Sequence, residues 1–503
     1  MEKIGFGALN WLTLGIYLIA MLGVGIYFTK KSGKDTDAFF KAGGKIPAWA
    51  AGLSIYATTL SAITFMSTPE KAFLGDWTYA AGNIAIIAIV PILIQYYIPF
   101  FRKLNVTTAY EYLEKRFNVS LRLLGSLLFI LFHIGRVAIV IYLPTLAITS
   151  ISDINPFLIA AVIGLLCVVY TFLGGMEGVI WSDVIQGIIL IGGALLIIVY
   201  GVVNIDGGFE TIINDAMKDQ KIVSAEDWKW SFAAATIPII FLGSIFNNLH
   251  QYTASQDVVQ RYSTTTSIKE TKRSLWTNAF FAGITIPIFY GIGTVLYSYY
   301  EQHQLLTEGF NTSALVPYFV LTTLPAGVAG LIIAAVFAAA QSTISSSLNS
   351  MSACVVVDFK KRFYPESSEK SNVLLARYVI IITGILGVGV SLFLINTNQS
   401  ETLDLFLSLV GLFGVPIAGT FALGIFTKRA NAPGALIGLI VSAITCYILQ
   451  QSGLISFFFS VFAFFSSFGI GYVASFFFPN GNKKTTGLTV FTINEEYEHE
   501  EAV

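Results

Sequence analysis

The feature that most constrains this chain is a series of apolar runs, each close to the length of a membrane-crossing helix. A helix needs about 20 predominantly apolar residues to cross the hydrocarbon core of a bilayer. Only 12% of the 503 residues are charged, against roughly 25% in an ordinary soluble domain. The sequence therefore predicts an all-α polytopic membrane protein of about thirteen spans. These spans lie near residues 9–28, 46–66, 76–100, 121–149, 156–173, 179–202, 231–250, 275–299, 316–350, 373–395, 402–426, 433–449 and 453–478.

The basic residues indicate how these spans are oriented. Lysine and arginine accumulate in the cytoplasmic loops of membrane proteins. With the N-terminus placed outside, 23 of the 29 basic residues fall in cytoplasmic segments, five fall in outer segments, and Arg136 lies within a span. The pattern predicts a multi-pass protein of the cell membrane (plasma or inner), with an extracytoplasmic N-terminus and a cytoplasmic C-terminus.

Composition and motifs exclude several classes of protein. The formal net charge of −1 does not give the basic surface that nucleic acid requires. The three cysteines are far apart and lack the spacing of a metal site. No Ser–His pairing, metal motif or acid cluster lies at one depth, so we expect no enzyme, and we infer no obligate protein partner. An ion channel would more naturally show a selectivity filter or a repeated subunit pattern, and the sequence shows neither.

Hydroxyl side chains interrupt one of the longest apolar runs, in the stretch "FAAAQSTISSSLNS". At helical spacing, five residues share one face, and Ser345 lies at its edge. Oxygen ligands without formal charge suit a weakly held monovalent ion, whereas a polar seam for helix packing explains the same pattern equally well. The five residues of this face are Ala339, Ser342, Thr343, Ser346 and Ser347.

The second span carries a weakly apolar patch at its centre, "SIYATTLSAITF". Small hydroxyl residues serve close helix packing, but a break in the helix would instead release backbone carbonyls that bind a cation. Both interpretations stay open at this point. Asp183 is ambiguous in the same way, because a carboxylate near the start of a span is a cap, an interfacial group or a cation ligand.

Arg136 lies in "LFHIGRVAIVIYL", with about a dozen apolar residues on either side. Ionisable groups at such depth are costly and mark functional sites. The spans at 9–28, 46–66 and 121–149 offer no carboxylate at comparable depth. A guanidinium that faces a water-filled cavity is a bidentate receptor for a carboxylate, so we predict that Arg136 binds substrate. His133, one helical turn away, is interpreted as a packing residue.

These motifs together resemble the sodium/solute symporter family over nearly the whole chain. "GGMEGVIWSDVIQ" looks like the signature of that family, "SIYATTLSA" and "AAAQSTISSSLNS" look like its first and eighth core helices, and "HQYTASQDVVQRY" resembles the end of its broken sixth core helix. The resemblance implies a LeuT-like fold of two inverted five-helix repeats, each beginning with an unwound helix. One leading helix precedes these repeats and two trailing helices follow them.

The resemblance divides the chain into six parts. A leading helix and cytoplasmic loop (1–45) precede core repeat one (46–202), an extracytoplasmic loop (203–230) and core repeat two (231–427). Two trailing helices (428–480) and a cytoplasmic acidic tail (481–503) follow.

The resemblance also implies one or two co-transported sodium ions. The first would lie between the unwound first core helix and the eighth, and the second deeper toward the cytoplasm. By position, the first ion is bound by the carbonyls of Ala57, Leu60 and Ala339 and the hydroxyls of Ser342 and Thr343. The second is bound by Asp183, Thr343, Ser346 and Ser347.

The implied substrate is a small carboxylated solute. Thr59, Ser61, Thr64, Asn83 and Arg136 look like the substrate residues of the family's sialic acid transporters, which import N-acetylneuraminate. A symporter for proline or another small carboxylate is the alternative within transport, and an ion channel is the alternative from another class. The roles of Asn247, Asn248 and Gln251, which flank the second expected break, stay open.

Overall fold

The computed structural model describes residues 3–231, 234–303, 310–397, 409–452, 454–479 and 485–494. Within these ranges the chain forms helices joined by loops and contains no extended strand. Most of the acidic tail that was expected at 481–503 therefore lies outside the described residues. The helices are α1 (Ala8–Ser32), α2 (Thr36–Lys41), α3 (Ala48–Thr59), α4 (Ala62–Leu74), α5 (Ala81–Ile92), α6 (Ile98–Lys103), α7 (Tyr110–Arg116), α8 (Val119–Thr149), α9 (Pro156–Val203), α10 (Gly208–Lys218), α11 (Ile237–Thr253), α12 (Gln256–Tyr262), α13 (Ile268–Thr285), α14 (Gly291–His303), α15 (Leu315–Thr323), α16 (Val328–Ala353), α17 (Lys361–Phe363), α18 (Glu369–Thr397), α20 (Val415–Phe426), α21 (Ala432–Gln450) and α22 (Phe457–Ala474).

The described residues contain nine helical stretches long and apolar enough to cross a membrane, and ten when the bent pair α3 and α4 is counted as one span. The expected spans 156–173 and 179–202 both lie in α9. Its 48 residues extend over about 72 Å at 1.5 Å per residue, more than twice the hydrocarbon thickness. The backbone of α9 leaves helical geometry at Gly175 (φ 54°, ψ −157°), so this position separates two crossings. The expected span 402–426 falls partly outside the described residues, and the count of thirteen stays a prediction.

Two helices are interrupted inside the membrane-spanning part of the chain. The first interruption separates α3 from α4 at Leu60 and Ser61, and the two helices meet at 65°. The second separates α11 from α12 at Ala254 and Ser255. An interrupted helix leaves backbone carbonyls without helical partners, which makes them available to an ion. The sequence left two interpretations open for the patch at 54–65, and the structure contains the break.

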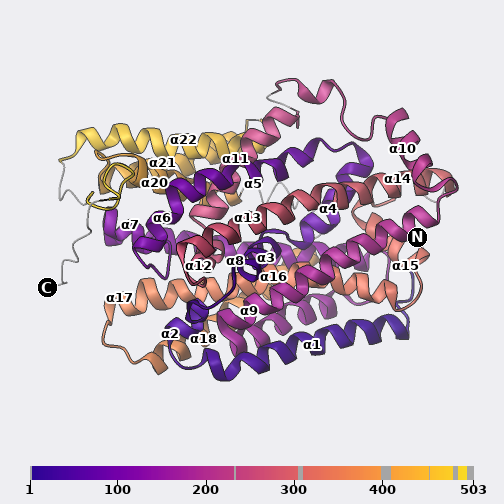
Figure 1. Cartoon of the computed structure of the whole chain (residues 1–503), viewed down its shortest axis with the longest axis horizontal. Coiled ribbons are helices and arrows are strands. Elements are labelled where there is room, and N and C mark those ends of the chain that lie inside the picture. The colour runs from indigo at the N-terminus through magenta and orange to yellow at the C-terminus, as the bar shows by residue number, and fades with distance from the viewer. Residues whose placement is uncertain are drawn as a thin grey trace.

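The helix α16 lies at the centre of the molecule (Figure 1), and every residue from Ile332 to Ala353 is buried. It packs against α1, α3, α4, α8, α9, α12 and α18. In Figure 1, α1 lies along one edge, whereas α21 and α22 lie at the opposite edge. Because neighbouring helices shield α16 from lipid, it can carry hydroxyl groups along its length without exposing them to hydrocarbon.

The polar loop expected at 203–230 forms α10 and packs back onto the ends of the spans. The Trp77 N–H donates to the carbonyl of Ile222 (2.7 Å), and the Lys221 ammonium donates to the carbonyl of Phe73 (2.9 Å). The same ammonium lies 4.1 Å from the ring centre of Tyr297 on α14. These contacts attach the loop to α4 and α14.

The turn at Gly175 yields a prediction about stability. A Cβ atom there would lie 2.9 Å from the Cβ of Ser32 and 3.1 Å from the carbonyl oxygen of Phe39, in a backbone conformation that side chains rarely adopt. We expect Gly175→Ala to destabilise the fold by about 1–3 kcal/mol. Gly192 is the control, since no atom of the described residues lies within 4 Å of a Cβ added at that position of the same helix. Thermal unfolding of the purified protein in detergent measures both variants, and equal midpoints would contradict the prediction.

Candidate functional site

The hydroxyl face of α16 meets the end of α3 where that helix is interrupted. The Ser342 hydroxyl donates to the carbonyl of Ala57 (2.8 Å) and to that of Ala339 (3.2 Å). The Thr343 hydroxyl lies 3.2 Å from the carbonyl of Thr58 and 3.4 Å from that of Ala339. Hydrogen bonds thus link four of the five residues that the sequence assigned to the first ion into one chain of contacts, and all four are buried.

Leu60, the fifth residue of that set, lies at the interruption itself. Its N–H closes the last turn of α3 on the carbonyl of Tyr56 (2.9 Å), while its own backbone is extended (φ −88°, ψ 107°). The chain therefore turns away before the Leu60 carbonyl can take up a helical hydrogen bond. Uncharged carbonyl and hydroxyl oxygens of this kind suit a monovalent cation better than a divalent one.

Asp183 lies in the interior of α9 and is fully buried, which excludes the capping and interfacial alternatives and leaves the cation ligand. Its Oδ2 accepts hydrogen bonds from the hydroxyl of Ser54 (2.6 Å) and from the hydroxyl of Thr58 (3.4 Å). The same oxygen pairs with Arg261 Nη2 at 2.7 Å. Its Oδ1 is buried and has no hydrogen-bond partner among the described residues. One carboxylate oxygen is therefore free to act as a ligand.

Ser346 is the residue of α16 that joins this carboxylate group. Its hydroxyl lies 2.9 Å from the hydroxyl of Thr58 and 2.6 Å from Arg261 Nη2. The Arg261 guanidinium thus bridges Asp183 and Ser346, two of the four residues assigned to the second ion. The Arg261 side chain is fully buried.

Ser347 faces a different neighbour. Its hydroxyl donates to the carbonyl of Thr343 (2.8 Å) and lies 2.9 Å from the Nδ1 atom of His133. The other ring nitrogen of His133 lies 3.2 Å from the hydroxyl of Ser255. His133 is thus a buried side chain with a hydrogen-bond partner at each ring nitrogen, which agrees with its interpretation as a packing residue.

Arg136 is buried and paired, which corrects the expectation that no carboxylate is placed to meet it. Its Nη1 lies 2.9 Å from Oδ2 of Asp257, and its Nη2 lies 3.2 Å from the carbonyl oxygen of Thr58. Gln251 contacts both members of the pair, at 3.5 Å from Arg136 Nη1 and 3.2 Å from Asp257 Oδ1. Asp257 lies on α12, beyond the second interruption, and not on the spans that precede Arg136 in the sequence.

The other candidate substrate residues are Thr59, Ser61 and Thr64 at the first interruption and Asn83 on α5. Thr59 is the last residue of α3, Ser61 immediately precedes α4, and Thr64 lies in the first turn of α4. Asn83 lies on α5, where its amide reaches the carbonyl of Ala282 on α13 at 3.5 Å. The structure thus gathers three of these residues at the break and places Asn83 on α5, which packs against α11 and α13.

Sequence reasoning missed Thr58, Asp257 and Arg261. The hydroxyl of Thr58 contacts the Asp183 group, while its carbonyl contacts Arg136 and Thr343, so it joins both parts of the site. Asp257 and Arg261 were visible in "QDVVQRY" as an acid and a base four residues apart. That spacing places them on one helical face, but it does not identify their partners. Asn247, left open above, accepts a hydrogen bond from Ser460 on α22.

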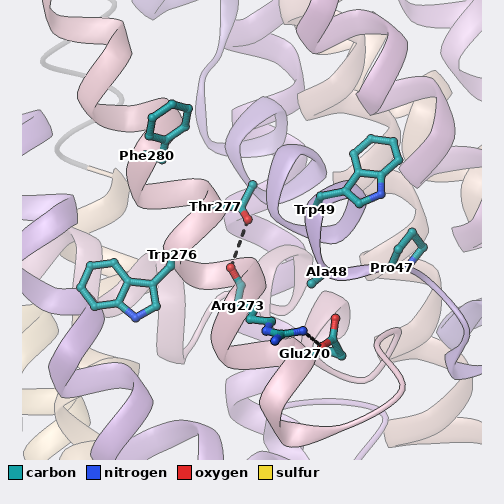
Figure 2. Close-up of a pocket in the computed structure, with 8 residues that line it drawn as sticks. All are labelled: Pro47, Ala48, Trp49, Glu270, Arg273, Trp276, Thr277 and Phe280. Carbon is teal, nitrogen blue, oxygen red and sulfur yellow. Dashed lines mark hydrogen bonds and ion pairs between the residues drawn. The ribbon is translucent and has the colours of Figure 1, made fainter.

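A hollow of about 600 Å³ lies elsewhere, between the start of α3 and α13 (Figure 2). The side chains of Trp49 and Trp276 lie on opposite sides of it, and Arg273 pairs with Glu270 at 2.7 Å. None of the candidate ion or substrate residues lines this hollow.

Comparison with known proteins places the chain in a family. The family model for "Sodium:solute symporter family" matches residues 39–442, more than half of the chain. The chain belongs to this family. The family resemblance drawn from the motifs is therefore confirmed, and so is the expectation of a transporter rather than an enzyme.

Individual relatives agree with this assignment. The sodium/sialic acid symporter NanT of Aliivibrio fischeri is 49% identical over 460 residues, which cover 91% of each chain. The sodium/sialic acid symporter SiaT of Proteus mirabilis is 49% identical over 461 residues, covering 91% of this chain and 93% of the relative. A solved outward-open, substrate-bound Na⁺-coupled sialic acid symporter matches with a TM-score of 0.88 and 46% identity, over 95% of this chain and 100% of that one. The expected fold class is confirmed.

Proposed function

We propose that this symporter couples sodium to the import of N-acetylneuraminate, a sialic acid, by alternating access. The observation that carries the proposal is the contact between the α16 hydroxyls and the carbonyls at the break in α3. This contact supplies neutral oxygens for an alkali cation directly beside a buried guanidinium. The names of the two relatives at 49% identity support sialic acid as the solute.

The first sodium ion binds the carbonyls of Ala57, Leu60 and Ala339 together with the hydroxyls of Ser342 and Thr343. A second ion binds Asp183 and Ser346, with Thr343 and Ser347 completing the set once Ser347 turns from His133. The unpartnered Oδ1 of Asp183 supports this second position, because a buried carboxylate oxygen without a donor is costly unless a cation occupies it. The ions are transported with the solute and are not resident cofactors.

The solute binds between the break and α8. Its carboxylate pairs with the planar fork of Arg136, while Thr59, Ser61, Thr64 and Asn83 supply hydroxyl and amide groups to its polar substituents. Direct pairing requires Asp257 to give up the Nη1 position that it holds in this structure.

The topology follows from the distribution of basic residues. We place the N-terminus and the 203–230 loop outside and the C-terminus in the cytoplasm, with the chain in the plasma or inner membrane. In this topology the leading helix and its loop are residues 1–45, the two core repeats are 46–202 and 231–427, and the trailing helices are 428–480.

Uptake into proteoliposomes tests the proposed solute. With an inward sodium gradient, we expect labelled N-acetylneuraminate to accumulate inside the vesicles, while labelled galactose stays near the level of empty vesicles. Replacing sodium by potassium should abolish the accumulation, because potassium is the larger ion and needs longer distances to its oxygen ligands than a site shaped for sodium provides. Accumulation of proline in place of the sialic acid would favour the alternative of a small-carboxylate symporter. Flux without a saturable solute would indicate a channel.

The first ion position predicts a change in sodium dependence. Ser342→Ala or Thr343→Ala removes one ligand oxygen, so we expect the sodium concentration for half-maximal uptake to rise about tenfold, the equivalent of roughly 1.4 kcal/mol. Ser352→Ala is the control, since that hydroxyl lies on the same helix and donates to the carbonyl of Asn349 (2.7 Å). Unchanged sodium dependence in both site variants would refute the assignment.

Arg136 predicts the response to the carboxylate of the solute. Arg136→Lys keeps the charge but loses the planar fork. Binding of the solute should therefore weaken at least about tenfold, which corresponds to the loss of one charged hydrogen bond. Arg136→Ala should weaken it further. An analogue whose carboxylate is replaced by a neutral amide should bind the wild type poorly and lose little more in Arg136→Ala. Calorimetric titration of both ligands against the wild type and Arg136→Ala gives the four affinities that this comparison needs. Equal losses for both ligands would mean that Arg136 has only a structural role.

A further inference from the structure

The short helix α12 carries two buried charges that connect the two halves of the candidate site. Asp257 and Arg261 are four residues apart and fully buried. Asp257 pairs with Arg136, and Arg261 pairs with Asp183. The four side chains carry two positive and two negative charges, so the group as a whole is neutral.

Arg261 holds the groups that a cation would use. Its Nη2 contacts the Oδ2 atom of Asp183 and the hydroxyl of Ser346, at 2.7 and 2.6 Å. Its Nε lies 2.7 Å from the hydroxyl of Ser54. A sodium ion bound to the free Oδ1 of Asp183 and to the Ser346 hydroxyl would displace this guanidinium, because both cations need the Ser346 oxygen and neutralise the same carboxylate.

Asp257 holds the group that an anion would use. Its Oδ2 lies 2.9 Å from Nη1 of Arg136, the geometry of a charged hydrogen bond. The carboxylate of a solute would present the same chemical group to the same guanidinium. Asp257 therefore holds the Nη1 position of Arg136 that the carboxylate of a solute would need.

We propose that Asp257 and Arg261 are internal substitutes for the two transported charges. Asp257 occupies Arg136 until a substrate carboxylate displaces it, and Arg261 occupies Asp183 until a sodium ion displaces it. Once both are released, Asp257 and Arg261 pair with each other across one turn of α12. This inference rests on the proposed sodium-coupled import of a carboxylated solute.

The exchange couples the two ligands by charge balance. A substrate carboxylate alone releases Asp257 while Arg261 is still paired with Asp183, so the buried Asp257 has no ionic partner. Sodium alone releases Arg261 while Asp257 is still paired with Arg136, so the buried Arg261 has no ionic partner. When both ligands are present, the released acid and base neutralise each other at the i, i+4 spacing. Each ligand consequently raises the affinity for the other by the same factor.

The surrounding hydrogen bonds permit this exchange. After leaving Arg136, Asp257 keeps donors in Gln251, in the Ser255 hydroxyl (2.5 Å) and in the Val258 N–H (3.0 Å). Arg261 keeps the backbone carbonyl of Asp257, to which its Nη1 already donates. On the other side, Asp183 keeps the hydroxyls of Ser54 and Thr58.

Calorimetric binding of N-acetylneuraminate to the purified full-length protein, at low and at saturating sodium, tests the exchange. In the wild type we expect sodium to tighten substrate binding by about tenfold or more, within the usual range of such coupling. Asp257→Asn removes the competitor, so substrate binding at low sodium should tighten roughly tenfold and the sodium effect should shrink. A residue that only positions Arg136 would give the opposite sign, with weaker binding and an undiminished sodium effect.

The cation half is measured without substrate, from the sodium concentration that gives half of the sodium-induced rise in the unfolding temperature. Arg261→Gln should lower this concentration about tenfold, because Asp183 loses its internal cation. This measurement on Arg261→Gln does not depend on Asp257→Asn, so it still tests the proposal if that variant does not fold. The double variant combines Asp257→Asn with Arg261→Gln. Its sodium effect on substrate binding should be no smaller than in either single variant, because each change alone already removes the pairing of Asp257 with Arg261.

Asp358→Asn is the matched control, because it breaks another buried ion pair, Arg122–Asp358 at 2.7 Å, that does not touch the site. It should leave the sodium effect at the wild-type value. Unchanged sodium coupling in both α12 variants, beside a normally coupled wild type, overturns the exchange alone. A wild type that binds no N-acetylneuraminate overturns the proposed function and the exchange with it.

Discussion

The contact between the interrupted end of α3 and the hydroxyl face of α16 is the interaction on which the rest of the structure depends. An interruption inside the membrane releases backbone groups that lipid cannot satisfy, so another part of the protein must supply their partners. The hydroxyls of Ser342 and Thr343 do so for the carbonyls of Ala57 and Thr58. The same oxygens that stabilise the break then form a set suited to an alkali cation, which is why fold and site coincide here.

Thr58 extends this contact into the charged part of the site. Its carbonyl accepts a hydrogen bond from Arg136, and its hydroxyl contacts Asp183 and Ser346. Removing either member of a buried ion pair leaves an uncompensated charge, which is strongly destabilising. Two such pairs, both made by α12, therefore lie where the protein can exchange an internal charge for a transported one. Two buried ion pairs contribute little to stability for the cost of burying their charges. The same pairs suit a protein that must bind an anion and a cation together.

Much of the fold was predictable from particular residues. The break at 54–65 was one of two interpretations of "SIYATTLSAITF", and the α16 face followed from the spacing of Ala339, Ser342 and Thr343. The partners of the buried charges were not predictable. Asp257 lies 121 residues beyond Arg136, and Arg261 lies 78 residues beyond Asp183. The spans at 9–28, 46–66 and 121–149 carry no carboxylate at the depth of Arg136, and its partner comes from the far side of the second interruption.

The sequence by itself determined the membrane setting, the helical spans, the hydroxyl stripe and the family, because apolar length and helical spacing are local properties of the chain. Only the tertiary structure decided that Arg136 is paired, that Asp183 is buried within its helix, and that Ser347 faces His133. These outcomes depend on which faces of distant helices meet. The spacing of residues along one helix specifies the members of each face, but the packing of whole helices selects the face that opposes it.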